Sequence, residues 1–419
     1  MNKLILPVLL IIAGVQAKAQ FTTIFKDTAT NNSIELFTNY NVGSNAITNS
    51  FINKFYLQNY INDNLKNSVS KNLDPMNNVG GDLNYGITYT RFKNDSIGLW
   101  GMKNTGYYVS LKNRTLIDGR FSRDFFNVFF DGNQSYKGKT ADFSDFNFNS
   151  LTYQQLEFGL IKKIETDQKQ YVIGGGLSLL NGQSHTSIIS NKSSLFTQQD
   201  GEYIDFTTNS TISRSDTSQN KLGKTNGLGL STHFFISYSS PAGSTLKLEV
   251  SDLGFIRWNK ESTTLKLDTS FHFEGIAVNN IFNFADPAYS NVPSDSAYIA
   301  RFLNHVKQDS YNSFLPALIE LSYDKKINKY TFLSGIKYRL NANYIPYLFM
   351  GCAYNFNPLF YVSANIGYGG YTKLSIGLEL AKRFAYGFTL LTGSQFIYGY
   401  LSPAQGTAQG AYISLEKNF

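Results

Sequence analysis

A serine and a histidine two residues apart, Ser231 and His233, form the pair in this sequence most suited to catalysis. In an extended strand they would share one face, where an imidazole can activate a hydroxyl nucleophile. A plainer interpretation, two polar residues on the wet face of a strand, needs no special geometry and is favoured. Nucleophilic catalysis therefore stays a minor hypothesis.

Other motifs with catalytic or metal-binding chemistry are weak. Gly138-Lys139-Thr140 resembles the end of a phosphate-binding loop, but Gly132 lies one residue too far upstream for that pattern. The four histidines have no pair at metal-ligand spacing, and the single cysteine, Cys352, cannot build a disulfide or a thiolate metal site. We predict no enzyme activity, no cofactor and no metal.

Charged residues on predicted strands near the carboxyl end are the best candidate ligand contacts. Two interpretations are open. A network of paired charges that fixes the shape of the fold is favoured, because buried charges must be paired. The alternative is a site for an anionic ligand, such as a carboxylate head group. The candidate residues are Lys337, Arg339, Lys373, Glu379 and Arg383.

Alternation of apolar and polar residues is the strongest structural signal and recurs along the chain. Between 329 and 341, for example, Tyr330, Phe332 and Ile336 alternate with Thr331 and Lys337. Such segments are about 9 to 13 residues long, the length that a tilted strand needs to cross a bilayer. Because the polar faces carry Lys, Arg, Glu and Gly, they suit a water-filled lumen. Cys352 falls on the apolar, outward phase.

Composition points the same way. Hydrophobic residues make up 42% of the 419 residues and aromatic residues 15%, but charged residues only 16%. This balance excludes a coiled coil and a charged disordered chain. No apolar run reaches about 18 residues, so no membrane-spanning helix is expected. We predict an all-β, transmembrane outer-membrane β-barrel of about 14 antiparallel strands (range about 12 to 16), because bacterial barrels prefer even numbers.

Three stretches break the alternation and predict short helices near 50–73, 120–130 and 294–308. Rings such as Phe121, Phe125 and Phe129 cannot all remain in water. The helices are therefore expected to plug the lumen, cap one mouth or meet a partner. If one is a plug, these three rings would line a narrow route for apolar ligands.

The amino terminus predicts export. Lys3, an apolar stretch and Ala17-Lys18-Ala19 together resemble a signal peptide over 1–19. Residues 20–419 would then form a single barrel domain. The formal charge of +7 includes the two lysines of that peptide, and the remaining basic residues are scattered, so nucleic-acid binding is not expected. The expected location is the outer membrane of a Gram-negative bacterium, among outer-membrane lipids.

The terminal Phe419, with Ile413 and Leu415 at alternate earlier positions, resembles the signal read by the barrel-assembly machinery. Lys417 departs from the apolar residue usual at its position, although a lysine stem can snorkel at the interface. The resemblance implies that this machinery is a partner during biogenesis.

A resemblance to a known family is carried by seven residues, Asp252-Leu253-Gly254-Phe255-Ile256-Arg257-Trp258. They resemble a motif of a family of Bacteroidota outer-membrane proteins of unknown function, and Phe130-Asp131-Gly132-Asn133 is similar to that family too. Its members distantly resemble FadL-type long-chain fatty acid transporters, which implies a barrel that passes hydrophobic compounds. From its residues alone, the heptapeptide predicts a strand end with a β-bulge at Gly254 and Trp258 at the membrane interface.

Three functions stay open. The first is passive uptake of hydrophobic or amphipathic small molecules. The second is a non-enzymatic accessory subunit of a secretion, adhesion or motility complex, with an outer-membrane protein partner. The third is an outer-membrane lipid hydrolase using Ser231 and His233, although the known hydrolase has the order His-x-Ser. The strand phase also predicts that Ile376→Arg, facing lipid, costs more stability than Ser375→Arg, facing the lumen.

Overall fold

The computed structural model describes residues 32–92, 101–166, 169–216, 224–274 and 306–419. The signal peptide expected at 1–19 and positions 294–305 of the third expected helix lie outside these residues. Positions 306–308 form a short strand, β11 (Val306–Gln308), and not the end of a helix.

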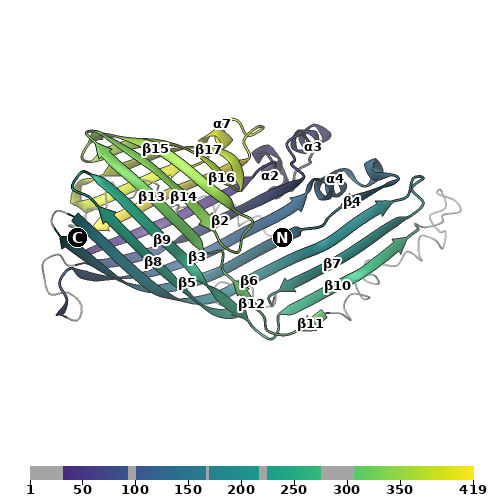
Figure 1. Ribbon diagram of the computed structural model, residues 1–419, viewed down its shortest axis with the longest axis horizontal. Helices are drawn as coiled ribbons and strands as arrows, with labels where there is room; N and C mark the ends of the chain where they lie inside the picture. Colours follow the sequence, from purple (N-terminus) through teal and green to yellow (C-terminus); the bar gives the residue numbers. More distant parts are fainter. Residues whose placement is uncertain (1–31, 93–100, 167–168, 217–223, 275–305) are drawn as a thin grey trace.

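Fourteen strands close a barrel in which each strand pairs antiparallel with the next and the last pairs with the first (Figure 1). The predicted fold class and strand number are confirmed. In their order around the barrel, the strands are β1 (Asn32–Ser44), β2 (Met76–Phe92), β3 (Thr105–Ser122), β5 (Phe146–Thr166), β6 (Lys169–Thr197), β8 (Gly227–Ser239), β9 (Ser244–Trp258), β13 (Leu318–Ile327), β14 (Tyr330–Arg339), β15 (Ile345–Asn357), β16 (Phe360–Gly370), β17 (Thr372–Arg383), β18 (Phe388–Ser394) and β19 (Ala408–Asn418).

The two ends of the barrel differ. At one end β1 begins and β19 finishes side by side, and the Phe419 N–H donates to the Asn32 carbonyl at 3.0 Å. We call this the termini end, and the opposite end, which carries the helices, the helix end. The turn at Gly369-Gly370 lies at the helix end, opposite the short turns at 325–328 and 357–358.

The wall continues beyond the barrel as an extra sheet at the helix end (Figure 1). The second half of the long strand β6 pairs there with β4 (Lys139–Asp142) and β7 (Ile204–Arg214), and β7 pairs with β10 (Thr263–Phe273). β11 pairs with β10, and β12 (Asn312–Phe314) pairs with the end of β9. Strands β7 and β10 therefore belong to this extension and not to the barrel.

The helices of the described chain are short, and none is long and apolar enough to cross a membrane. They are α2 (Asn49–Tyr56), α3 (Asp63–Ser70), α4 (Arg123–Asp131) and α7 (Ile397–Leu401), with 3-10 turns η2 (Gln134–Tyr136) and η3 (Ala385–Gly387). Side chains of Thr48, Asn62 and Ser122 cap the first three helices by accepting a backbone N–H. The stretch 50–73 thus holds two helices, and 120–122 still belongs to β3.

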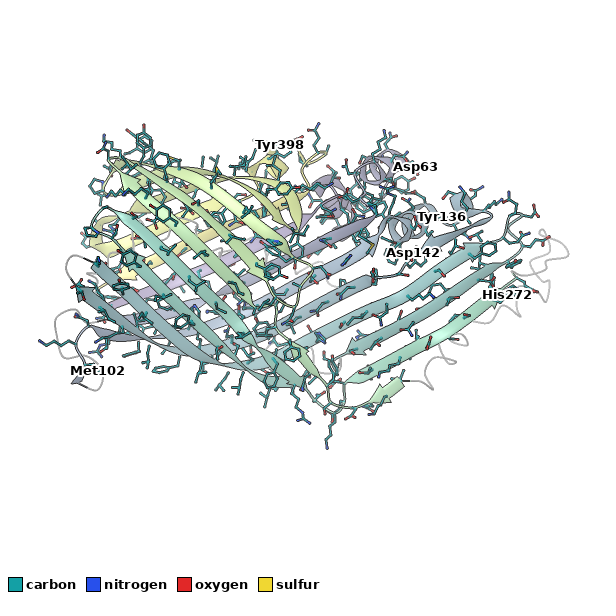
Figure 2. The ribbon with its side chains drawn as sticks, viewed as in Figure 1. Asp63, Met102, Tyr136, Asp142, His272 and Tyr398 are labelled. Atoms are coloured by element: carbon teal, nitrogen blue, oxygen red, sulfur yellow. The ribbon has the colours of Figure 1, made fainter. Side chains whose placement is uncertain are left out.

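Helices α2, α3 and α4 pack on the outside of the wall. Val79 and Phe121, which they cover, occupy odd positions of β2 and β3, whereas lumen-lining residues such as Asp82 and Arg114 occupy even ones. Phe51 and Phe126 complete the buried center of this aromatic cluster. The helices therefore cover the rim from outside and do not fill the lumen. Figure 2 shows Asp63 of α3 and Tyr398 of α7 along the same edge, with Met102 at the opposite end.

The outward positions of the barrel strands are large, apolar and exposed, as a lipid-facing surface requires. Leu111, Leu177, Leu230 and Met350 are examples. Cys352 follows Met350 on the same face and is partly exposed, in agreement with the predicted outward phase.

Candidate functional site

The lumen contains a cavity of about 580 Å³. Its lining runs from Ser33, Thr90 and Asn418 at the termini end to Tyr371 and Thr372 at the helix end. Side chains from strands all around the barrel contribute to it, because every second residue of each strand points inward. The volume lies within the range of ligand pockets, about 300–1,000 Å³.

One wall of the cavity carries a chain of hydrogen-bonded charges on β3, β5, β8 and β9. Lys112 Nζ lies 2.7 Å from Glu157, and Lys247 Nζ lies 2.8 Å from Glu249. The His233 imidazole lies between them, with Nδ1 2.7 Å from Glu157 and Nε2 3.0 Å from Glu249. Tyr108 also donates to Glu157, at 2.6 Å. These contacts satisfy charges that would otherwise be costly away from bulk water.

A bulge adds a second buried pair to this wall. Asp252 adopts a left-handed φ of 61°, and the pairing of β8 with β9 shifts beside it, between Thr232 and Phe234. The carboxylate of Asp252 turns into the lumen, where it is buried and forms an ion pair with Arg114. The sequence had predicted a bulge at Gly254, but the bulge lies two residues earlier, at Asp252.

Trp258 is buried inside the barrel, so the prediction of an interfacial position is wrong. Its ring stacks on His185 with centroids 5.3 Å apart, and its Nε1 donates to Ser313 at 2.8 Å. The shift at Asp252 changes the phase of β9, which brings Ile256 and Trp258 inward, into a small apolar core with Leu315.

Ion pairs also cross the lumen or line its opposite wall. Arg339 on β14 lies 3.1 Å from Asp82 on β2, a strand on the far side of the barrel. Lys337 pairs with Glu320 on the neighbouring strand β13, at 3.3 Å. Arg339 therefore links two walls and narrows the lumen.

A second link, which we call the bridge, consists of Asp118, Asn343 and Tyr371. Asp118 on β3 accepts hydrogen bonds from the Asn343 backbone N–H at 2.8 Å, from Asn343 Nδ2 at 2.6 Å and from the Tyr371 hydroxyl at 2.8 Å. Asn343 and Tyr371 belong to connections at the helix end of the opposite wall. A Cβ at Gly80 would lie 2.3 Å from the Tyr371 ring, so this glycine lets the ring lie against β2. The bridge closes part of the lumen near the helix end.

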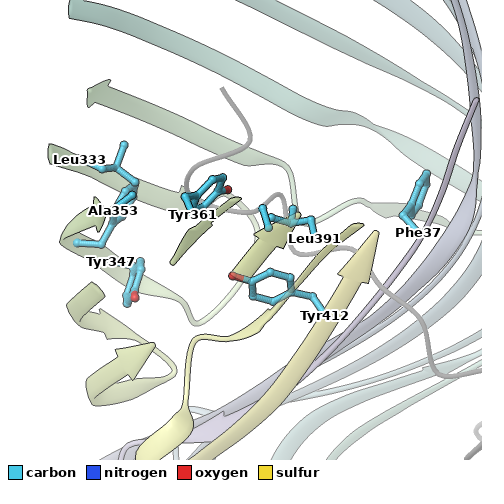
Figure 3. Close-up of a cluster of buried hydrophobic side chains, with 9 residues drawn as sticks. Phe37, Leu333, Tyr347, Ala353, Tyr361, Leu391 and Tyr412 are labelled. Atoms are coloured by element: carbon cyan, nitrogen blue, oxygen red, sulfur yellow. The ribbon is translucent and has the colours of Figure 1, made fainter. Parts of the chain in front are cut away.

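A cluster of buried side chains occupies part of the lumen beside β14–β19 (Figure 3). Tyr347, Tyr361 and Tyr412 pack there with apolar neighbours in a buried cluster. Glu379 is buried among them and accepts hydrogen bonds from the Tyr361 and Tyr412 hydroxyls, at 2.8 and 2.6 Å. The cluster therefore narrows the lumen on this side of the barrel.

Residues 31–391 match the model of DUF5723, which is described as a family of unknown function. The chain belongs to the DUF5723 family. No match was found among curated proteins.

Solved structures similar to this DUF5723 protein are membrane barrels with low sequence identity. The ΔS2S3 mutant of the monoaromatic hydrocarbon channel TodX, a protein of Pseudomonas putida, is 12% identical, with a TM-score of 0.46 over 98% of this chain and 94% of that one. A Pseudomonas aeruginosa FadL homologue is 11% identical, with a TM-score of 0.42 over 94% and 90%. Outer membrane phospholipase A of Escherichia coli is 10% identical, with a TM-score of 0.26 over 91% of each chain. At these scores the likenesses carry no argument about function.

The charged residues predicted as one site are held by different partners in this DUF5723 protein. Lys337, Arg339 and Glu379 face the lumen in the separate contacts described above. Lys373 lies at the helix end, 2.8 Å from Asp74, and Arg383 ends β17 at the termini end, its N–H donating to the Leu359 carbonyl. Lys337, Arg339 and Lys373 are each paired with an acid that the sequence had not singled out, whereas Glu379 is held by tyrosine hydroxyls.

The predicted aromatic contacts are also placed elsewhere. Phe121 is buried beneath the helices, Phe125 stacks on Phe129, and the Phe129 ring is largely exposed. None of the three lines the 580 Å³ cavity. The DUF5723 protein therefore does not bring them together with Arg339.

Several residues of the cavity escaped the sequence reasoning. Lys112 and Arg114 lie two positions apart in β3, and Glu157 follows Gln155 at the same spacing in β5. This two-residue spacing of polar residues within an alternating strand could have identified them as lumen-facing. Asp252 gave no such signal, because it faces inward only through the bulge.

Ser231 and His233 both face the lumen of the DUF5723 barrel. Ser231 Oγ lies 3.5 Å from Gln155 Nε2, and both nitrogens of His233 face carboxylates. An imidazole held in this way is not oriented to accept a proton from Ser231. The geometry disfavours the lipid hydrolase hypothesis.

The phosphate-loop hypothesis fails on topology, because Gly138 is followed by strand β4 and not by a helix. In the part of the chain that the structure describes, no group of His, Cys, Asp and Glu is arranged to hold a metal ion.

The Lys373–Asp74 pair predicts a small pH effect. The hydrogen bond from Lys373 lowers the pKa of Asp74 below its usual value of 3.8. A carboxyl whose pKa is depressed by folding stabilises the folded state above its unfolded pKa, and this contribution is lost as the pH falls through the folded pKa. We expect Lys373→Met to flatten the decline in unfolding free energy between about pH 5 and pH 2. Urea unfolding in detergent would show it; an unchanged slope would mean that the pair is broken in solution.

Proposed function

We propose that this protein is an outer-membrane channel for passive entry of small amphipathic molecules whose polar part is uncharged or zwitterionic. The observation that carries the proposal is the cavity of about 580 Å³ inside a closed barrel, whose basic residues are all paired with acids. Of the expected cargo, hydrophobic or amphipathic, we favour the amphipathic class because the lining combines apolar surface with many polar side chains.

The pairing of the charges supports this choice. Among the described residues, six lysine and arginine side chains line the cavity, and each lies within ion-pair distance of a carboxylate. The pairs are Lys112–Glu157, Arg114–Asp252, Lys163–Glu165, Lys247–Glu249, Lys337–Glu320 and Arg339–Asp82. A paired cation attracts an anionic head group less than a free one does, since the two charges oppose each other at a distance. Hydroxyl groups such as those of Ser33, Thr90 and Ser237 offer hydrogen bonds to neutral polar groups.

The bridge supports a restricted route. Because Asp118 joins the two walls, we expect the wild type to give small or brief currents in planar bilayers. Asp118→Ala removes the acceptor of three hydrogen bonds and should give larger, steadier currents. Asp200→Ala, on the exposed tip of the β6–β7 hairpin, is the matched control.

The rate at which solutes enter liposomes that contain Asp118→Ala then tests which class of molecule the channel carries. Uncharged and zwitterionic solutes of equal size should enter at least as fast as anionic ones. Wide, steady currents from the wild type would contradict the closed lumen. Failure of every solute to cross Asp118→Ala would contradict transport.

Outer-membrane localisation is part of the proposal. The lipid-facing outer surface and the signal peptide expected at 1–19 support it. Cell fractionation with heat-modifiable gel migration tests it, and deletion of Phe419 should slow assembly. A soluble periplasmic protein without a mobility shift would contradict it.

One observation favours the second candidate, an accessory subunit of an outer-membrane complex. Large aromatic side chains at the helix end are exposed, including Phe55, Tyr60 and Phe129. Such a patch is often a contact surface. A protein that co-purifies in mild detergent and is lost when these residues become serine would support this candidate.

A further inference from the structure

One part of the exposed aromatic surface adjoins the apolar outward face of the barrel wall. Helix α2 is fixed to the outward face of β1 and β19. Gln409 Nε2 donates to the Tyr40 hydroxyl at 3.1 Å and to Asn53 of α2 at 2.9 Å. Gln409 shares the outward phase of β19 with Ile413 and Leu415, which are exposed apolar residues. Helix α2 therefore adjoins the lipid-facing surface directly.

Helix α7 is joined to α2 at the same place. The buried Asn49 side chain donates to the carbonyls of Gly399 in α7 and Ala408 in β19, at 3.0 and 2.8 Å. A Cβ at Gly399 would lie 1.9 Å from the Ala408 carbonyl oxygen, so a glycine is needed for this close approach. The two helices and the strand are therefore joined in one packed unit.

The free edge of this unit is apolar and aromatic. Tyr56 is 71% exposed and Leu401 is 79% exposed. Tyr40 accepts a hydrogen bond from Gln409, which also binds α2, and Tyr400 belongs to α7. We call Tyr40, Tyr56, Tyr398, Tyr400 and Leu401 the shelf (Tyr398 is labelled in Figure 2).

The shelf continues the lipid-facing surface toward the helix end. Tyr40 lies four residues after the exposed Leu36 on the same face of β1, a rise of about 13 Å along the strand. The apolar band of an outer-membrane barrel is about 25 Å tall and is bordered by aromatic girdles. Tyrosine suits that border, because its ring is apolar and its hydroxyl can reach water.

We infer that the shelf lies in the membrane interface, with the tyrosine rings and Leu401 at the boundary between lipid head groups and acyl chains. Lys54, in the last turn of α2, can reach the head-group phosphates. The occupant of this surface is therefore lipid, and not a protein partner. The inference rests on the proposed membrane location of the barrel.

Spin labels at single cysteines test the inference in proteoliposomes. The native Cys352, on the lipid-facing wall, is the positive control. In a Cys352→Ser background, Tyr56→Cys and Leu401→Cys report on the shelf, and Glu202→Cys, on the exposed tip of the β6–β7 hairpin, is the water control. We expect the shelf labels to collide more with oxygen than with a water-soluble nickel complex, as at Cys352, and Glu202→Cys to show the reverse.

Two other patterns of collision would contradict the inference, and a third would contradict the membrane location. Shelf labels that collide with nickel as freely as Glu202→Cys would overturn the inference, and so would labels shielded from both reagents, which indicate a protein contact. If the label at Cys352 also prefers nickel, the barrel is not in the bilayer and the proposed location itself fails.

Discussion

Replacing Arg114 with methionine should lower the free energy of unfolding by about 3–5 kcal/mol, because it leaves a buried carboxylate without its partner. The Asp252 side chain is 3% exposed and the Arg114 side chain 13% exposed, so water cannot replace the lost cation efficiently. Gln155 Nε2, 3.3 Å from Asp252, would be left as a neutral donor. Urea unfolding in detergent, followed by gel mobility, measures the change.

The double variant Arg114→Met with Asp252→Leu is the matched control. Replacing both members of a buried pair by apolar residues is often neutral or stabilising, so most of the lost stability should return. A single variant as stable as the wild type would show that water enters this part of the lumen and that the pair is not buried in solution.

Ile376→Arg should destabilise the inserted barrel by about 2–4 kcal/mol if Ile376 lies near the bilayer midplane. Ile376 is an exposed residue of β17, paired with Ile366 of β16 on the outward face. An arginine there would meet acyl chains. Unfolding by urea in liposomes, where the lipid is present, gives the comparison with a lumen variant.

The matched lumen variant is Thr90→Arg, and it should be milder because Thr90 lines the cavity. Ser375→Arg, which the strand phase alone proposed for this purpose, is unsuitable. Ser375 is buried, and its Oγ lies 2.8 Å from the Tyr347 hydroxyl in the buried cluster beside β14–β19. Equal costs for Ile376→Arg and Thr90→Arg would contradict the assigned faces of the wall.

The strands were predictable because the alternation between lipid and lumen is a local property of the sequence. The alternating stretch 329–341, for example, contains β14. The extension sheet could not be separated from the barrel in this way, because β7 and β10 alternate as barrel strands do. Which strand closes the barrel depends on pairing, and pairing is not local.

The candidate site was predictable only in part, for the same reason. Lys337 and Arg339 were correctly assigned to the polar face of a strand, but Arg339 meets Asp82 across 257 residues of sequence. Trp258 was misplaced because a single residue with a left-handed φ, Asp252, reverses the phase of the strand after it. The sequence predicted a β-bulge, but at Gly254, two residues too late to indicate that Trp258 faces inward.

The packing of Tyr347, Tyr361 and Tyr412 has a mechanical consequence. A close-packed interior resists compression, so we expect the packed β14–β19 side of the barrel to be stiff. The β1–β9 side surrounds the cavity and should deform more easily. Widening of the lumen should therefore move the connections that carry Asn343 and Tyr371, which join the packed side to β3. These connections can move without breaking hydrogen bonds between strands.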